Sequence, residues 1–238
     1  MTFTKTKTKT KTKTKTKASG FPSNYWDINL LILPGQSRFY ENPSWKEIDI
    51  DPFPDANGTA DELTTLLKLQ DEMLTDSVES KRRKSEIRDE VDDIETPWQR
   101  LMMFGPQSHP NTYILMQAAI QIGTIAVMHY KGQFNRPRPS QLEPKLRPII
   151  TVPGHPAYPS GHSTQAHLIA NALSTVAHNH ELAEQLFVIA GRIAENREYA
   201  GVHYKSDSHA GKVLAREIYA QFEDAYADIF RDASQEWL

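Results

Sequence analysis

The chain of 238 residues contains no cysteine, so it can form neither a disulfide framework nor a thiolate metal site. It also lacks an apolar run that approaches the length of a bilayer-spanning helix, and only 39% of its residues are hydrophobic. Residues 1–17 have no apolar segment of the kind found in a secretory signal. We therefore expect a soluble cytoplasmic protein without a transmembrane segment. An organelle presequence is the alternative for this threonine-rich, acid-free start.

The first residues form a low-complexity segment in which threonine and lysine alternate strictly from Thr4 to Lys17. It has no apolar side chain to bury, so we expect residues 1–18 to be a solvated tail outside the folded domain. Without its seven lysines the formal net charge of −3 becomes about −10, so a basic tail precedes an acidic body. Two alternatives are a salt-sensitive contact with a polyanion and an extended strand that pairs with another copy.

Residues 19–238 are long enough for one domain with a single core. Two segments are expected to be irregular because prolines interrupt them. Residues 19–58, read as a wrapping segment, contain Pro22, Pro34, Pro43, Pro52 and Pro54. Residues 133–158, read as a surface loop, contain Pro137, Pro139, Pro144, Pro148, Pro153 and Pro156.

Elsewhere in the body, apolar residues recur at helical spacing, and no run alternates as a strand does. The expected helices include residues 77–94, 111–130, 161–176, 181–199 and 207–232. The first of these is so rich in charge that we expect its surface to be solvated. The fold class is therefore predicted to be mainly α, as a single-domain helical bundle.

Three short blocks between residues 131 and 207 combine cationic side chains, two histidines, a serine and a glycine. They are Lys131-x6-Arg138-Pro139, Pro159-Ser160-Gly161-His162 and Arg197-x5-His203-x3-Asp207. Guanidinium and ammonium groups form charge-assisted hydrogen bonds with oxyanions, and backbone N–H groups add fixed donors. The blocks therefore predict a site for phosphate or an analogue of phosphate.

In their order and spacing, these blocks resemble the signature of the superfamily that unites type 2 phosphatidic acid phosphatases, bacterial non-specific acid phosphatases and vanadium haloperoxidases. The resemblance implies the superfamily's α-helical fold. It also implies that His203 attacks phosphorus and forms a phosphohistidine, while Asp207 holds the other ring nitrogen. His162 would protonate the leaving alkoxide and then activate water. The oxygens of the phosphoryl group would be held by Lys131, Arg138, Ser160, Gly161 and Arg197, and no metal ion is required.

The resemblance leaves two enzymes to choose between. Bound vanadate, with His203 as its ligand, would make the protein a haloperoxidase that uses hydrogen peroxide and halide. His155 favours this alternative, because bromoperoxidases carry a histidine at that place beside the vanadate. Met128 opposes it, because haloperoxidases usually carry tryptophan there, and Met128 and His155 are candidates for a substrate or halide pocket.

We favour a soluble, metal-independent phosphomonoesterase without a cofactor, acting on a small phosphorylated substrate. A third hypothesis is an inactive fold that binds anionic polymers. A zinc site made of His155, His162 and His203 has the right residue types but lacks paired-ligand spacing. A homo-oligomer is a further expectation, because irregular N-terminal arms often wrap around neighbouring copies.

Overall fold

The computed structural model describes residues 26–238, so the Lys/Thr tail of residues 1–18 and residues 19–25 lie outside the described residues. The described part is helical and contains no strand, which confirms the mainly α prediction. Its elements are α1 (Ile28–Glu41), the 3-10 helix η2 (Pro43–Lys46), α2 (Ala56–Leu74), α3 (Val78–Asp92), α4 (Thr96–Met102), α5 (Pro110–Phe134), α6 (Pro139–Leu142), α7 (Gly161–Ala177), α8 (His180–Tyr199), α9 (Lys205–Ala225) and α10 (Ala227–Gln235).

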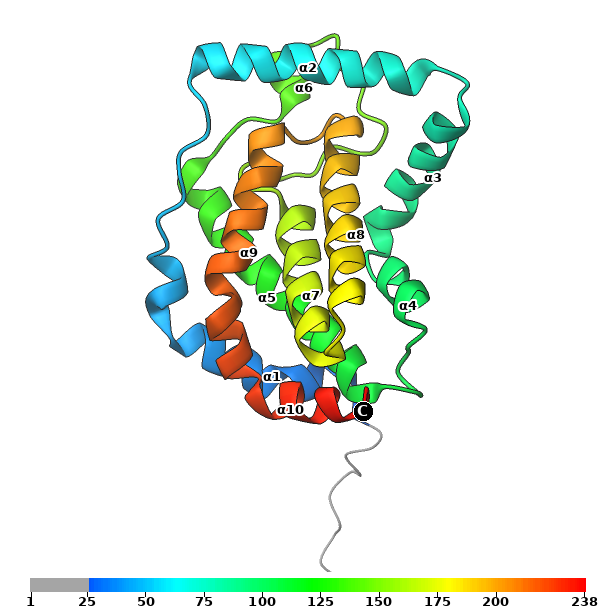
Figure 1. Ribbon diagram of the computed structural model, residues 1–238. Helices are drawn as coiled ribbons and strands as arrows, with labels where there is room; N and C mark the ends of the chain where they lie inside the picture. The colour runs from blue at the N-terminus through cyan, green and yellow to red at the C-terminus, as the bar shows by residue number, and fades with distance from the viewer. Residues whose placement is uncertain (1–25) are drawn as a thin grey trace, which may run out of the picture.

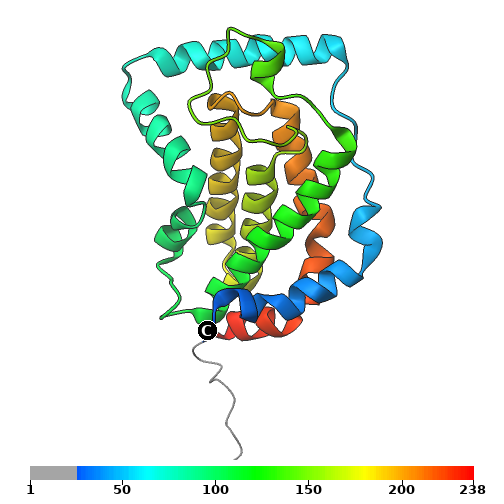
Figure 2. The ribbon, with the colours of Figure 1, turned by 180° about the vertical axis from the view of Figure 1, so that it is seen from behind.

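Helix α7 lies at the centre of the bundle and packs against α5, α8 and α9 (Figures 1 and 2). Its buried side chains lie on almost every side of the helix and include Ala166, Leu168, Ile169 and Leu173, each with no exposed surface. A helix that is apolar nearly all round must be enclosed by other helices. This requirement places α7 inside and the more amphipathic helices around it.

The two ends of the bundle are covered differently. Helix α2 lies across one end, and α1 and α10 lie across the other (Figures 1 and 2). The C-terminal ends of α5 and α8 and the N-terminal ends of α7 and α9 all point toward the α2 end. The ends of these helices and the segments that connect them are therefore gathered there, and they carry the three sequence blocks.

The expectation of an irregular segment over residues 19–58 is wrong for most of its described part. Residues 28–41 form α1 with Pro34 inside the helix, Asp27 caps the N-terminus, and Ile32, Gly35 and Phe39 are buried. Pro43 begins the 3-10 helix, where the missing N–H leaves no bond unmade. Burial of an apolar stripe thus outweighs the hydrogen bond that Pro34 removes.

Two other boundaries also differ from the sequence prediction. The helix expected over residues 207–232 begins at Lys205 and divides at Tyr226 into α9 and α10. The Tyr226 hydroxyl donates to the Ile32 carbonyl at 2.9 Å, and its ring fills the space beside Gly35. The division between α9 and α10 therefore coincides with the contact of Tyr226 with α1. The segment 133–158, expected to be a loop throughout, contains the last residues of α5 and the short helix α6.

The stretch Pro110–Leu142 is long and apolar enough, by length and composition, to cross a membrane, with half of its most apolar window buried in the fold. The expectation that no apolar run approaches that length is therefore wrong by this criterion, whereas the absence of a transmembrane segment stays a prediction. Polar residues such as Gln117 and Gln121 interrupt the apolar run, yet the average over the window remains high. Within the bundle, α5 packs against α7, α1 and α10, as a core helix does.

Gly211 of α9 allows a close approach to the start of α7. A Cβ atom at this position would lie 2.6 Å from the Ser160 carbonyl oxygen and 2.8 Å from the Ser163 Cβ atom. We expect Gly211→Ala to lower the free energy of unfolding by about 1–3 kcal/mol in urea denaturation, because the backbone of α7 must shift. The control is Gly191→Ala in α8, where a Cβ atom meets nothing within 4 Å. This control should be neutral or slightly stabilising because alanine favours helix; equal losses in both variants would contradict the packing argument.

Candidate functional site

The sequence blocks come together at the α2 end of the bundle, delivered by different elements. Lys131 lies in the last turn of α5, and Arg138 follows the end of that helix. Ser160 is the N-cap of α7, so Gly161 and His162 form its first turn. Arg197 lies in the last turn of α8, His203 in the α8–α9 connection and Asp207 in the first turn of α9.

A cavity of about 260 Å³ lies where these elements meet. Seven of the ten side chains or backbone positions singled out from the sequence line it: Met128, Lys131, His155, Gly161, His162, Arg197 and His203. The other three, Arg138, Ser160 and Asp207, do not line the cavity but lie next to residues that do. Arg138 contacts His203, Ser160 caps α7, and Asp207 is fully buried beneath His203.

The His203 ring is held between a carboxylate and a guanidinium. Nδ1 lies 2.9 Å from Oδ2 of Asp207, and Nε2 lies 3.0 Å from Nη1 of Arg138. A carboxylate accepts and a guanidinium donates, which assigns the proton to Nδ1 and the lone pair to Nε2. Burial lowers the pKa of His203 well below its usual value, and Arg138 and Lys131 lower it further. The ring is therefore neutral, and Nε2 has the electronic form of a nucleophile or an oxyanion ligand.

Lys131 and Arg138 also hold the backbone around the cavity. The Lys131 ammonium donates to the carbonyls of Pro156 at 2.6 Å and Ala157 at 3.0 Å. Arg138 donates from Nε to the carbonyl of His155 at 2.9 Å and from Nη1 to that of Val202 at 2.7 Å. Burial lowers the pKa of Lys131 to about 7, with a smaller contribution from Arg138. An anion in the cavity would therefore strengthen the charged form of Lys131.

Arg197 has donors that the described protein does not use. Nη2 is bonded to the carboxylate of Glu90 and, at 3.1 Å, to the carbonyl of Ile87. Nε and Nη1 are buried without a hydrogen-bond partner among the described residues. A buried unpaired donor costs about 1–3 kcal/mol, so these groups favour an acceptor in the cavity. An oxyanion supplies such acceptors and the negative charge as well.

Glu90 of α3 is a site residue that the sequence analysis missed. The expectation that the 77–94 helix has a solvated surface is wrong on one face, because Ser80, Arg83, Ile87 and Glu90 are buried there. These four positions recur every three or four residues, which is the signal of an inward stripe. Only Ile87 among them is apolar, so the stripe does not stand out in the sequence.

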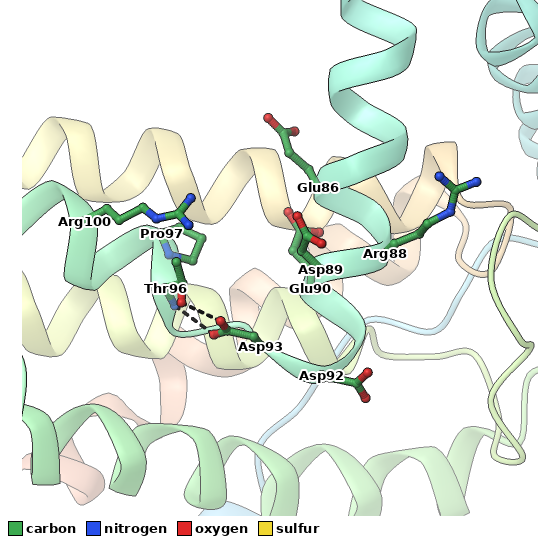
Figure 3. A pocket seen from close by; sticks show the side chains of 9 residues that line it. All are labelled: Glu86, Arg88, Asp89, Glu90, Asp92, Asp93, Thr96, Pro97 and Arg100. Atoms are coloured by element: carbon green, nitrogen blue, oxygen red, sulfur yellow. Dashed lines mark hydrogen bonds between the residues drawn. The ribbon is translucent and has the colours of Figure 1, made fainter.

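Glu90 reaches two groups of the cavity at once. Its carboxylate pairs with Arg197 and accepts 2.7 Å from the Asn196 amide, while its backbone carbonyl lies 2.9 Å from Nε2 of His162. Glu90 also borders a neighbouring cavity of about 410 Å³ between α3 and α4, with Glu86, Asp89 and Arg100 around it (Figure 3). Burial raises the pKa of Glu90, and the Arg197 guanidinium opposes that rise. The pair thus joins α3 to α8 beneath the site.

His162 is positioned as a neutral base in the described structure. Because a carbonyl only accepts, Nε2 of His162 carries the proton toward Glu90 and Nδ1 is left with a lone pair. Burial lowers the pKa of His162 to about 4, with Arg197 the next contributor. Binding of an anion beside the ring would raise this pKa and allow His162 to carry a proton.

His155 and Met128 lie at the edges of the cavity. Nδ1 of His155 is 3.1 Å from Nη2 of Arg138, and His155 also lines a second, larger cavity of about 740 Å³ together with Arg138. Burial lowers the pKa of His155, and Lys131 lowers it further. Met128 is 45% exposed and forms part of the rim. Among residues 26–238 no three histidine or carboxylate side chains gather as metal ligands, so the zinc alternative finds no support there.

The buried Glu90–Arg197 ion pair should stabilise the fold. Glu90→Gln keeps the shape of the side chain but removes the counterion of a buried guanidinium. We expect the free energy of unfolding to fall by about 3–5 kcal/mol in urea denaturation. Saturating sulfate should recover part of the loss, because a bound anion replaces the missing charge.

The matched control for Glu90→Gln is Asp92→Asn, which removes a carboxylate of the same helix that is exposed to solvent. It should change the free energy of unfolding by less than about 0.5 kcal/mol. A Glu90→Gln protein as stable as the control would show that the buried pair does not hold α3 against α8.

Because the pKa of Lys131 is lowered to about 7, the affinity of the cavity for anions should depend on pH near neutrality. Below about pH 7 the ammonium is charged, and above it the charge is lost, so anion affinity should fall as the pH rises through 7. Sulfate is a suitable probe because it stays doubly charged over this range. Calorimetry should show sulfate binding on the order of tenfold weaker at pH 8 than at pH 6.

Lys131→Arg is the control, because arginine keeps its charge at both pH values. In this variant the affinity for sulfate should vary much less between pH 6 and pH 8. The same pH dependence in both proteins would assign the effect to another group.

Two solved structures match a large part of this chain. A bacterial vanadium-dependent iodoperoxidase matches with a TM-score of 0.59 and 16% sequence identity, over 77% of this chain and 57% of that chain. A transmembrane PAP2-type phosphatidylglycerolphosphate phosphatase from Bacillus subtilis matches with a TM-score of 0.41 and 19% identity, over 71% of this chain and 96% of that chain. No family model and no curated protein sequence matches. The chain therefore has a mainly α fold similar to that of the iodoperoxidase.

Proposed function

We propose that this protein is a soluble, metal-independent hydrolase of small phosphomonoesters that acts through a phosphohistidine on His203. The observation that carries the proposal is a neutral His203, whose Nε2 lone pair accepts from Arg138, on the same cavity as two further buried cations. Lys131 and Arg197 supply these charges, and Arg197 has two donors to spare. This combination suits an electrophilic phosphorus whose oxygens are negatively charged.

The first chemical step follows from the assigned protons. Nε2 of His203 attacks phosphorus, a P–N bond forms, and the bond to the ester oxygen breaks. Asp207 accepts the Nδ1–H hydrogen bond and stabilises the positive charge that develops on the ring. His162, protonated when the dianionic ester binds beside it, gives its proton to the leaving alkoxide.

In the second step His162 acts as a base instead of an acid. His162, now neutral, takes a proton from a water molecule that attacks phosphorus, and the P–N bond breaks. Inorganic phosphate leaves, and His203 regains its lone pair. In both steps the equatorial oxygens lie near Lys131, Arg197 and the N–H group of Gly161 at the N-terminus of α7, which favours negative charge.

A vanadate-dependent peroxidase is the second candidate, and His155 is the observation that favours it. Nε2 of His203 would hold the vanadate, and the same cations would neutralise it. Vanadate would supply activation of hydrogen peroxide for halide oxidation. His155 lines the same cavity as His203, as a side chain that contacts the reacting oxygens would. Met128 favours the phosphatase, because it adds a partly exposed apolar side chain to the cavity, which suits the organic part of an ester.

A cytoplasmic location, contact of the Lys/Thr tail with a polyanion and assembly into a homo-oligomer remain parts of the proposal. The half-buried window of Pro110–Leu142 supports a water-soluble bundle, because its buried side chains already face other helices.

The test is hydrolysis of an aryl phosphate by chelator-treated protein. We expect turnover that needs no metal and is inhibited by orthovanadate. His203→Ala should lower kcat on the order of 1,000-fold or more, because the attacking atom is removed. The control is His209→Ala, which removes an exposed histidine of the same helix as Asp207 and should leave kcat unchanged.

The two candidate functions give opposite results in this assay. Absence of phosphatase turnover, together with peroxide-dependent bromination after addition of vanadate, would favour the peroxidase. Full phosphatase activity in His203→Ala would exclude the phosphohistidine scheme.

A further inference from the structure

Arg136 is a buried cation that lies two residues before Arg138 but faces away from the oxyanion cavity. It is 1% exposed and does not line that cavity. Nη1 donates to Oδ1 of Asp207 at 2.6 Å and to the hydroxyl of Ser206 at 2.8 Å. Nη2 donates to Oε2 of Glu62 at 2.8 Å. The guanidinium therefore bridges two carboxylates, one beneath His203 and one on α2.

Aromatic rings fix the plane of this guanidinium. Its central carbon lies 3.6 Å from the ring centroid of Tyr204 and 4.9 Å from that of Phe53. A cation stacked on two rings and bonded at both ends has little freedom to turn. The stacking thus fixes the orientation of the Arg136 guanidinium, with Nη1 directed at Oδ1 of Asp207.

Glu62 anchors the outer end of this arrangement. Besides Arg136, it accepts from the backbone N–H of Ser206 at 2.7 Å and from the Ser206 hydroxyl at 2.9 Å. These bonds tie α2 to the first turn of α9, which carries Asp207. Helix α2 lies across this end of the bundle (Figure 1), so Glu62 reaches Arg136 from outside the cavity.

The two oxygens of Asp207 have separate partners. Oδ1 accepts from Arg136, whereas Oδ2 accepts from Nδ1 of His203 and from the backbone N–H of Tyr204. A fully buried carboxylate needs such bonds to remain charged. If Arg136 is lost, Asp207 has no charged side chain bonded to Oδ1, and the orientation of Oδ2 toward His203 is no longer enforced.

We propose that Arg136 and Glu62 form a positioning pair that holds Asp207, and through it His203, in the orientation needed to attack the phosphoryl group. The part of this proposal that concerns turnover rests on the proposed function, whereas the part that concerns the His203–Asp207 hydrogen bond does not. Neither residue touches the oxyanion cavity, so both act through Asp207.

The test is nuclear magnetic resonance of the unliganded protein, combined with kinetics on an aryl phosphate. The Nδ1–H signal of His203, identified by its absence in His203→Ala, should lie far downfield and exchange slowly in the parent protein. In Arg136→Gln it should move upfield or vanish through exchange. In the same variant, kcat should fall about 10- to 100-fold while KM stays within about twofold.

The control is Arg147→Gln, which removes an exposed arginine from the same segment between α5 and α7 and should change neither the signal nor kcat. Glu62→Gln should displace the signal in the same direction as Arg136→Gln but by less, because Arg136 keeps its bond to Asp207. A folded Arg136→Gln protein with the parent signal and the parent kcat would overturn the proposal. If Arg136→Gln fails to fold, Glu62→Gln decides, and an unchanged signal there overturns the proposal.

The resonance measurement separates this inference from the proposed function. A parent protein that shows no phosphatase activity, yet loses the Nδ1–H signal in Arg136→Gln, would refute the hydrolase and leave the positioning pair supported. A parent that hydrolyses phosphate esters, with a signal insensitive to both variants, would refute only the positioning pair.

Discussion

Charges buried at one end of the bundle need partners, and this need connects the outer helices to the core. Removing an ion from water costs several kcal/mol, so a buried cation needs a carboxylate or several hydrogen bonds to stabilise it. Arg197 of α8 meets Glu90 of α3, and Arg136 meets both Asp207 of α9 and Glu62 of α2. Helices α2 and α3, which contribute little to the apolar core, are therefore held against it by ion pairs as well as by packing.

The charges around the cavity determine the protonation of the side chains that line it. Burial and neighbouring cations shift the pKa values of Lys131, His162 and His203 in the same direction, toward loss of the proton. The carboxylates Glu90 and Asp207 lie behind the cations and do not enter the cavity, and Arg197 keeps two unpaired donors. These unpaired donors and the surrounding positive charge favour an anion in the cavity. The same arrangement suits a phosphoryl group or vanadate, so both candidate functions of the proposal depend on it.

Much of the fold could be predicted from local sequence patterns. The helices that carry the core, such as α5, α7 and α8, have apolar stripes or apolar runs that report their own burial. The errors arose where a local signal competes with a distant contact. Pro34 normally interrupts a helix, but α1 buries Ile32 and Phe39 against the bundle, and the end of α9 coincides with the contact of Tyr226 with α1.

The sequence by itself determined the three blocks, their order and the residue types that suit an oxyanion, because these features depend on spacing along the chain. The resemblance carried by these blocks also implied that Asp207 holds a ring nitrogen of His203, four residues before it, and the structure places the two in contact. Only the tertiary structure decided which carboxylates pair with the buried cations. Glu90 is 107 residues from Arg197 and Glu62 is 74 residues from Arg136, and a local periodicity cannot tell which helices pack together. The protonation and orientation of the site depend on those distant pairs, so they are properties of the assembled bundle.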